Sequence, residues 1–65
     1  MTIYDFEYLH IDSGMQKVEI YEINKCETIY TGTLRDACDE YGDCEISTYE
    51  VDNDVMTFNI DMENN

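Results

Sequence analysis

The segment that most constrains the fold is CEISTYEVDNDVMTFNIDM, residues 44–62, which alternates in polarity on either side of Asn53 and Asp54. A two-residue loop at this Asn-Asp pair would make a tight β-hairpin. The resulting cross-strand pairs are Asp52 with Val55, Val51 with Met56, and Tyr49 with Phe58. This register gathers the apolar residues of both strands, with Ile60, on one face. A shift by one residue would break that face, so we predict a hairpin in this register.

Residues 33–41 predict an amphipathic helix. The apolar residues recur at the helical period and are Leu34, Ala37, Cys38 and Tyr41. Thr33 followed by Asp36 resembles an N-cap with an acid in the first turn, where the helix dipole favours negative charge. Gly42 is a natural stop. The other side of this helix would carry Asp36, Asp39, Glu40 and Asp43.

The rest of the chain predicts strands. Residues 3–11 alternate with aromatic enrichment, residues 17–23 form a second run, and residues 27–31 a third, with turns at residues 12–14 and 24–25. We therefore expect an α+β fold of order βββαββ, in which one amphipathic helix packs on one face of a largely antiparallel sheet. Residues 1–62 would form a single small domain, and residues 63–65 a short flexible tail.

The residues that carry metal or catalytic chemistry lack the spacing that such chemistry needs. His10, Cys26, Cys38 and Cys44 are too far apart for the short ligand pairs of structural zinc. The acidic stretches do not match the order of an EF-hand loop. No nucleophile or phosphate-loop motif accompanies His10. We expect no enzyme activity, no metal site and no cofactor.

The charge balance separates this chain from most small domains. Sixteen Asp and Glu oppose three Lys and Arg, which gives a formal net charge of -13 over 65 residues, whereas small domains usually carry a magnitude of about 2 to 8. Ten of the acids and no Lys or Arg fall in residues 36–65. Such a charge would repel nucleic acids and anionic membranes, so direct binding to either is not expected.

The spacing of the carboxylates is similar to that of phosphates. From Asp36 to Asp43 the helix rises about 10.5 Å, or roughly one charge per 2.6 to 3.5 Å, against about 3.4 Å per phosphate along one DNA strand. Strand residues two positions apart, such as Glu50 and Asp52, lie about 6.6 to 7 Å apart. A solvated helix face is the ordinary explanation for such a stripe. The absence of interspersed Lys, which would serve solubility and helix stability, argues against it.

The first functional hypothesis is a nucleic-acid mimic that blocks the basic DNA- or RNA-binding surface of another protein, such as a nuclease of a restriction or CRISPR system. In composition the chain resembles the DNA-mimic inhibitors of mobile genetic elements, a class with no shared motif from which to transfer residues. The partner-binding residues would be Asp36, Asp39, Glu40, Asp43, Glu45, Glu50, Asp52 and Asp54. Aromatic contacts would come from Tyr8, Tyr21 and Tyr30.

Two alternatives remain open from the sequence. One is a structural module that self-associates through its sheet, as a homodimer for example, with the charge serving solubility. The other is a protein that binds cations weakly. Three unpaired cysteines, with no export signal and no apolar run of about 20 residues, predict a cytoplasmic location.

Overall fold

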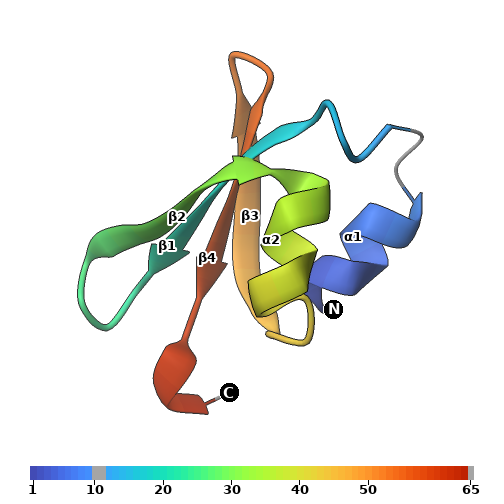
Figure 1. The fold of residues 1–65 in the computed structure, drawn as a ribbon. Helices are drawn as coiled ribbons and strands as arrows, with labels where there is room; N and C mark the ends of the chain where they lie inside the picture. Colours follow the sequence, from blue (N-terminus) through green and yellow to red (C-terminus); the bar gives the residue numbers. More distant parts are fainter. Residues whose placement is uncertain (10–11, 65) are drawn as a thin grey trace.

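The computed structural model describes residues 1–9 and 12–64 as two helices and four strands, followed by a 3-10 turn (Figure 1). The elements in chain order are α1 (Ile3–Leu9), β1 (Lys17–Glu22), β2 (Glu27–Thr33), α2 (Leu34–Tyr41), β3 (Ile46–Asp52), β4 (Val55–Ile60) and η1 (Met62–Asn64). The expected α+β class, with a helix packed on a mostly antiparallel sheet, is confirmed. Asn65, in the predicted tail, lies outside the described residues.

The sheet has the strand order β2-β1-β4-β3. The pairs β1–β2 and β3–β4 are antiparallel hairpins, whereas β1 and β4 run parallel in the centre. The two hairpins are joined by α2, which connects β2 of the first hairpin to β3 of the second. This crossover allows β1 and β4 to lie side by side in parallel. The strands β2 and β3 lie at the two edges of the sheet.

The predicted register of the second hairpin is confirmed. Asp52 pairs with Val55, and Val51 pairs with Met56. Asn53 and Asp54 both have positive φ, at 51° and 65°. Positive φ at both central residues is what a two-residue type I′ hairpin turn requires. Local turn chemistry and the burial of one face therefore specify the same pairing.

The helix expected at residues 33–41 is present. Thr33 caps it, since its side-chain oxygen accepts a hydrogen bond from the Asp36 backbone N–H at 3.2 Å. Leu34, Ala37 and Cys38 are buried against the sheet. Tyr41 is partly buried against the same core. The other side of α2 carries Arg35, Asp36, Asp39 and Glu40, which are exposed.

The strand expected at residues 3–11 is wrong, because residues 3–9 form helix α1. Two hydrogen bonds between Thr2 and Asp5 stabilise the start of this helix. The Thr2 N–H donates to the Asp5 carboxylate, and the Asp5 N–H donates to the Thr2 carbonyl. Ile3 is buried at the helix–helix contact. The observed order is αββαββ, and two helices rather than one cover the sheet. His10 and Ile11, included in the predicted strand, lie outside the described residues.

The core lies between one face of the sheet and the two helices. Strand residues pointing to this side alternate along β1 and β4, and the Phe6 ring of α1 packs on Phe58 at 5.0 Å between centroids. The fully or nearly buried apolar residues are Ile3, Val18, Ile20, Leu34, Ala37, Cys38, Met56, Phe58 and Ile60. In the part of the chain that the structure describes, no helix covers the opposite face of the sheet (Figure 1). Polar side chains on alternate strand positions are therefore directed to that open face.

Candidate functional site: the acidic surfaces

The outer side of α2 carries three of the predicted carboxylates. Asp36, Asp39 and Glu40 are all exposed, and none makes an ion pair among the described residues. Asp43 is also exposed but lies beyond the helix, which ends at Tyr41. We call Asp36, Asp39, Glu40 and Asp43 the helix set. The sequence placed all four on one helical stripe, and the structure keeps three of them there.

Gly42, the C-cap residue of α2, packs against the Tyr4 ring of α1. A Cβ atom at Gly42 would come within 2.4 Å of the Tyr4 ring, while the Tyr4 N–H donates to the Gly42 carbonyl at 3.0 Å. Gly42 has φ of -55°, an ordinary helical value. The close approach of α1, rather than a left-handed conformation, therefore requires glycine here and sets where Asp43 emerges.

The other four predicted carboxylates belong to the second hairpin and its approach. Glu45 precedes β3 and accepts a hydrogen bond from the Met1 amine at 2.8 Å, which raises the pKa of that amine. Asp54 lies in the β3–β4 turn. Glu50 and Asp52 alternate with the core-facing positions of β3, so they project from the open face. We call Glu45, Glu50, Asp52 and Asp54 the hairpin set.

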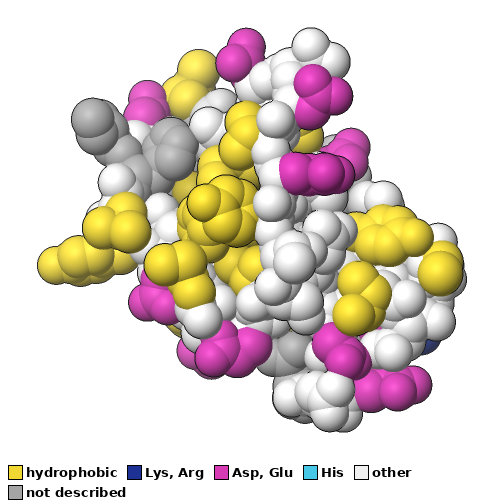
Figure 2. All heavy atoms as spheres, turned by 180° about the vertical axis from the view of Figure 1, so that it is seen from behind, with side chains coloured by type: hydrophobic (Ala, Val, Ile, Leu, Met, Phe, Trp, Pro, Cys, Tyr) yellow, Lys and Arg dark blue, Asp and Glu magenta, His cyan; other side chains and the backbone are white. Residues whose placement is uncertain are grey.

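The eight predicted residues therefore fall into two groups rather than one continuous surface. The helix set faces away from the sheet on the helical side, whereas Glu50 and Asp52 face away on the other side. A helix and a sheet that bury their apolar faces against each other necessarily turn their polar faces in opposite directions. Seen from behind, carboxylates are spread around the rim of the molecule rather than gathered in one stripe (Figure 2).

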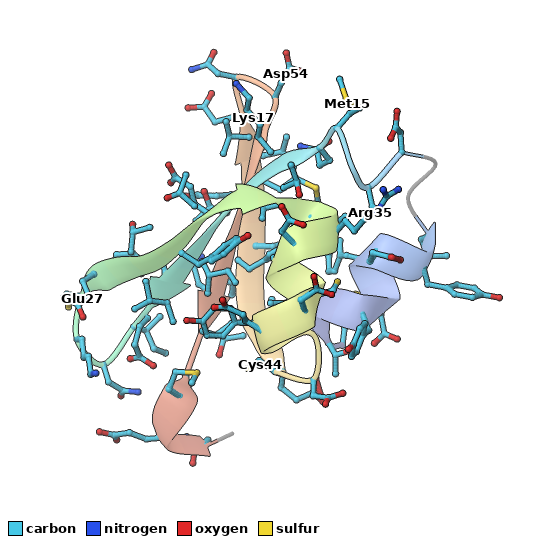
Figure 3. All side chains as sticks on the ribbon, in the orientation of Figure 1. Met15, Lys17, Glu27, Arg35, Cys44 and Asp54 are labelled. Carbon is cyan, nitrogen blue, oxygen red and sulfur yellow. The ribbon has the colours of Figure 1, made fainter. Side chains whose placement is uncertain are left out.

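The three cations lie away from the outer side of α2. Lys17 lies at the same end of the sheet as Asp54 (Figure 3), and Lys25 is in the β1–β2 loop. Arg35 belongs to α2, but its guanidinium lies against Gly14 in the loop before β1. The carboxylates of the helix set consequently remain without a compensating charge among the described residues.

Two side chains on the inner side of the helical layer, Tyr30 of β2 and Cys38 of α2, have raised pKa values. Burial, and then the charges of Asp36, Glu40 and Asp39, raise the pKa of the Tyr30 hydroxyl. Burial, followed by the charges of Glu7 and Asp39, raises the pKa of the Cys38 thiol to about 11. Charges of both helices, Glu7 on α1 and Asp39 on α2, thus act on Cys38.

Glu7 is the member of this surface that the sequence prediction missed. The strand expected at residues 3–11 includes it, whereas in the structure it lies on α1 and its charge acts on Cys38 of α2. The signal that could have found it is the segment TIYD at residues 2–5, which has the same Thr-x-x-Asp spacing as TLRD at residues 33–36.

The three predicted aromatic contacts lie apart from one another. Tyr8 on α1 is 87% exposed. Tyr21 is half-buried on the open face, because its neighbours Ile20 and Glu22 face the core. Tyr30 is paired with Ile20 and packs edge-on against Tyr41 of α2, at 5.8 Å between ring centroids. Only Tyr30 lies near the helix set.

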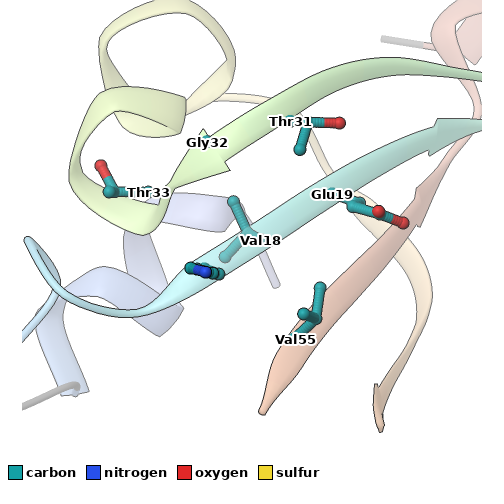
Figure 4. Close-up of a pocket in the computed structure, with 7 residues that line it drawn as sticks. Val18, Glu19, Thr31, Gly32, Thr33 and Val55 are labelled. Carbon is teal, nitrogen blue, oxygen red and sulfur yellow. The ribbon is translucent and has the colours of Figure 1, made fainter. Parts of the chain in front are cut away.

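A shallow cavity of about 330 Å³ lies where β2, β1 and β4 meet (Figure 4). Its lining residues are Lys17, Val18, Glu19, Thr31, Gly32, Thr33 and Val55. It contains no predicted site residue.

The described residues contain no group of three or more His, Cys, Asp or Glu side chains placed to hold a metal ion. The three cysteines are free thiols, exposed at Cys26, buried at Cys38 and half-buried at Cys44.

Within residues 1–9 and 12–64, neither helix has the length and apolar character needed to cross a membrane.

No protein-family model, no curated protein and no solved structure matches this chain.

Proposed function

We propose that the protein binds the basic nucleic-acid-binding surface of another protein and blocks it, acting as a nucleic-acid mimic. The helix set is the surface that makes this contact. The observation that supports the proposal is the run of exposed carboxylates on and just after α2, which no Lys or Arg of the described residues neutralises. A defence nuclease of the restriction or CRISPR type is the kind of partner that such a surface would inhibit.

The mechanism is competition without catalysis. Carboxylates of the helix set pair with the Lys and Arg side chains that otherwise hold phosphates, as charge-assisted hydrogen bonds. The net charge of -13 attracts a basic partner over long distances and speeds association at low salt.

The test is binding to a panel of basic nucleases and DNA-binding proteins over a salt series, with duplex DNA as competitor. One variant neutralises the helix set (Asp36→Asn, Asp39→Asn, Glu40→Gln, Asp43→Asn). Its matched control neutralises the hairpin set (Glu45→Gln, Glu50→Gln, Asp52→Asn, Asp54→Asn). Each variant removes four charges from the same total, so long-range attraction falls equally in both.

The expected result is salt-sensitive binding that DNA displaces. Neutralising the helix set should cost about 2 to 5 kcal/mol of binding free energy if its carboxylates are buried in the complex, while the hairpin set should mainly slow association. Absence of binding at low salt, affinity that ignores salt, or equal losses for the two variants would refute the assignment.

Self-association through the sheet is the competing function. Its support is that, among residues 1–9 and 12–64, β2 and β3 each have a neighbouring strand on one side only. A dimer that forms independently of salt, measured by sedimentation of the wild-type chain, would favour this function over binding to a basic partner.

A further inference from the structure

Strand β3 has an outer edge that the sheet leaves open. Of the described strands, β4 alone neighbours β3 in the sheet, so alternate residues of β3 direct their backbone N–H and C=O groups outward. Ser47 is the extra residue at an irregularity between Ile46 and Thr48, and residues 48–52 pair regularly with β4 beyond it. A regular strand with unpaired backbone groups is a template for another strand.

The chain already uses the beginning of this edge. The Ile46 N–H donates to the Met1 carbonyl at 2.9 Å, and Thr2 forms an isolated antiparallel bridge with Glu45. No other described segment pairs with the outer edge beyond this point. The first two residues of the chain therefore pair with the start of this edge and leave residues 48–52 exposed.

The two sides of this edge differ in chemistry. Tyr49 and Val51 point to the helical side and are 55% and 59% exposed, with the Tyr49 ring held edge-on against Phe6 at 4.7 Å. Glu50 and Asp52 point to the open side and are exposed. From behind, hydrophobic side chains show near the middle of the molecule and in a second group toward its right side, with carboxylates near both (Figure 2).

We propose that residues 48–52 of β3 bind an extended segment of another protein, in which apolar residues alternate with Lys or Arg, by adding it as a fifth strand. Apolar side chains of the segment would contact Tyr49 and Val51, while its basic side chains would contact Glu50 and Asp52. This inference goes beyond the proposed function, because it uses a different surface and applies equally to a basic partner that binds no nucleic acid.

Charge complementarity selects a basic segment over a second copy of this chain. If two β3 strands paired antiparallel about Val51, Glu50 of each would lie opposite Asp52 of the other. Like charges directly opposite each other destabilise a strand pair, and two chains of net charge -13 repel at long range. A segment with Lys or Arg at alternate positions removes both penalties.

The test uses a fluorescent peptide of seven residues alternating Lys and Val, with binding followed by anisotropy and by backbone amide shifts of the protein. A control peptide carries methyl groups on its two central peptide nitrogens, which removes the backbone donors. Val51→Lys places a repelling charge on the β3 edge. Thr28→Lys adds the same charge to β2, the opposite edge of the sheet, and serves as the matched control.

The expected result is that Val51→Lys weakens peptide binding by about tenfold or more, and that Thr28→Lys changes it by about twofold or less. The methylated peptide should bind at least tenfold more weakly, and amide shifts should centre on residues 48–52. Equal losses for the two variants, undiminished binding of the methylated peptide, or a dimer abolished by Val51→Lys would overturn the proposal. Neutralising the helix set should leave these amide shifts in place, which separates this test from that of the proposed function.

Discussion

The carboxylate of Glu22, at the end of β1, accepts a hydrogen bond from the backbone N–H of Met62 at 2.6 Å, across forty positions of sequence. The same carboxylate also accepts from the backbone N–H groups of Asn24 and Lys25 in the β1–β2 loop. Glu22 is only 2% exposed. One buried carboxylate thus joins the β1–β2 loop to the segment that follows β4.

Replacing Glu22 with Gln should lower the thermal unfolding midpoint by about 5 °C or more. The amide keeps one acceptor oxygen but places an NH₂ group where the carboxylate receives backbone donors, and hydrogen bonds to a charged group are the stronger kind. Glu19→Gln is the control, since it removes the same charge from the open side of the same strand. Similar midpoints for the two variants would show that the Glu22 hydrogen bonds add little.

The stability difference between wild type and Glu22→Gln should depend on pH. Burial opposes ionisation of Glu22, but the three backbone donors outweigh it and lower the pKa of Glu22 below the ordinary 4.5. A lowered folded-state pKa contributes stability that is complete above the unfolded value and is lost as pH falls through the folded value. Urea titrations should therefore give a constant difference above about pH 5.5 that shrinks below 4.5. A difference that grows on acidification would contradict this.

Gly42→Ala should destabilise the fold by about 1 to 3 kcal/mol, the usual cost of overpacking. The new methyl group would overlap the Tyr4 ring and the Cys38 carbonyl, both within 2.6 Å of its position. Gly14→Ala is the matched control, because its nearest neighbours are guanidinium atoms of Arg35 at 3.1 to 3.2 Å, the movable end of a long side chain. Chemical denaturation would compare the two, and equal effects would argue against close packing of α1 on Gly42.

Asp54→Gly should stabilise the protein by about 0.5 to 1 kcal/mol. Asp54 has φ of 65°, and glycine adopts this left-handed conformation without steric cost, which makes Asn-Gly a favoured hairpin turn. Asp54→Asn removes the same charge while keeping a side chain, so it measures the electrostatic part alone. If Asn stabilised the protein as much as Gly did, charge rather than backbone conformation would be the cause.

Raising NaCl from about 10 to 150 mM should raise the unfolding midpoint by several degrees, because salt screens exposed like charges over roughly 8 to 10 Å. The effect should be smaller in the variant that neutralises the helix set, since fewer repelling pairs remain. Differential scanning fluorimetry would provide both curves. A midpoint insensitive to salt would mean that the carboxylates repel one another less than their exposure implies.

Local sequence was sufficient to predict the register of the second hairpin and the position of α2. The Asn53-Asp54 turn and the alternation around it allow one register that buries a face, and Thr33 with Asp36 starts a helix whose apolar period is unambiguous. In the first nine residues the local signals conflict. The aromatic alternation favours a strand, while Thr2 and Asp5 favour a helix start, and packing of Ile3 and Phe6 under α2 and against Phe58 resolves the conflict.

The sequence by itself was sufficient to predict that the carboxylates of the helix set and the hairpin set are exposed, because they occupy polar positions of amphipathic segments or of the loops beside them. The burial of Glu22 was not predictable in this way, because it depends on the loops that pack around it. Only the tertiary structure decided which of the exposed carboxylates share a surface. The crossover from β2 through α2 to β3 lays the helices on one side of the sheet, so burial of both apolar faces directs the helix set one way and Glu50 and Asp52 the other. Alternation within a segment cannot encode this, since it depends on how distant segments pack.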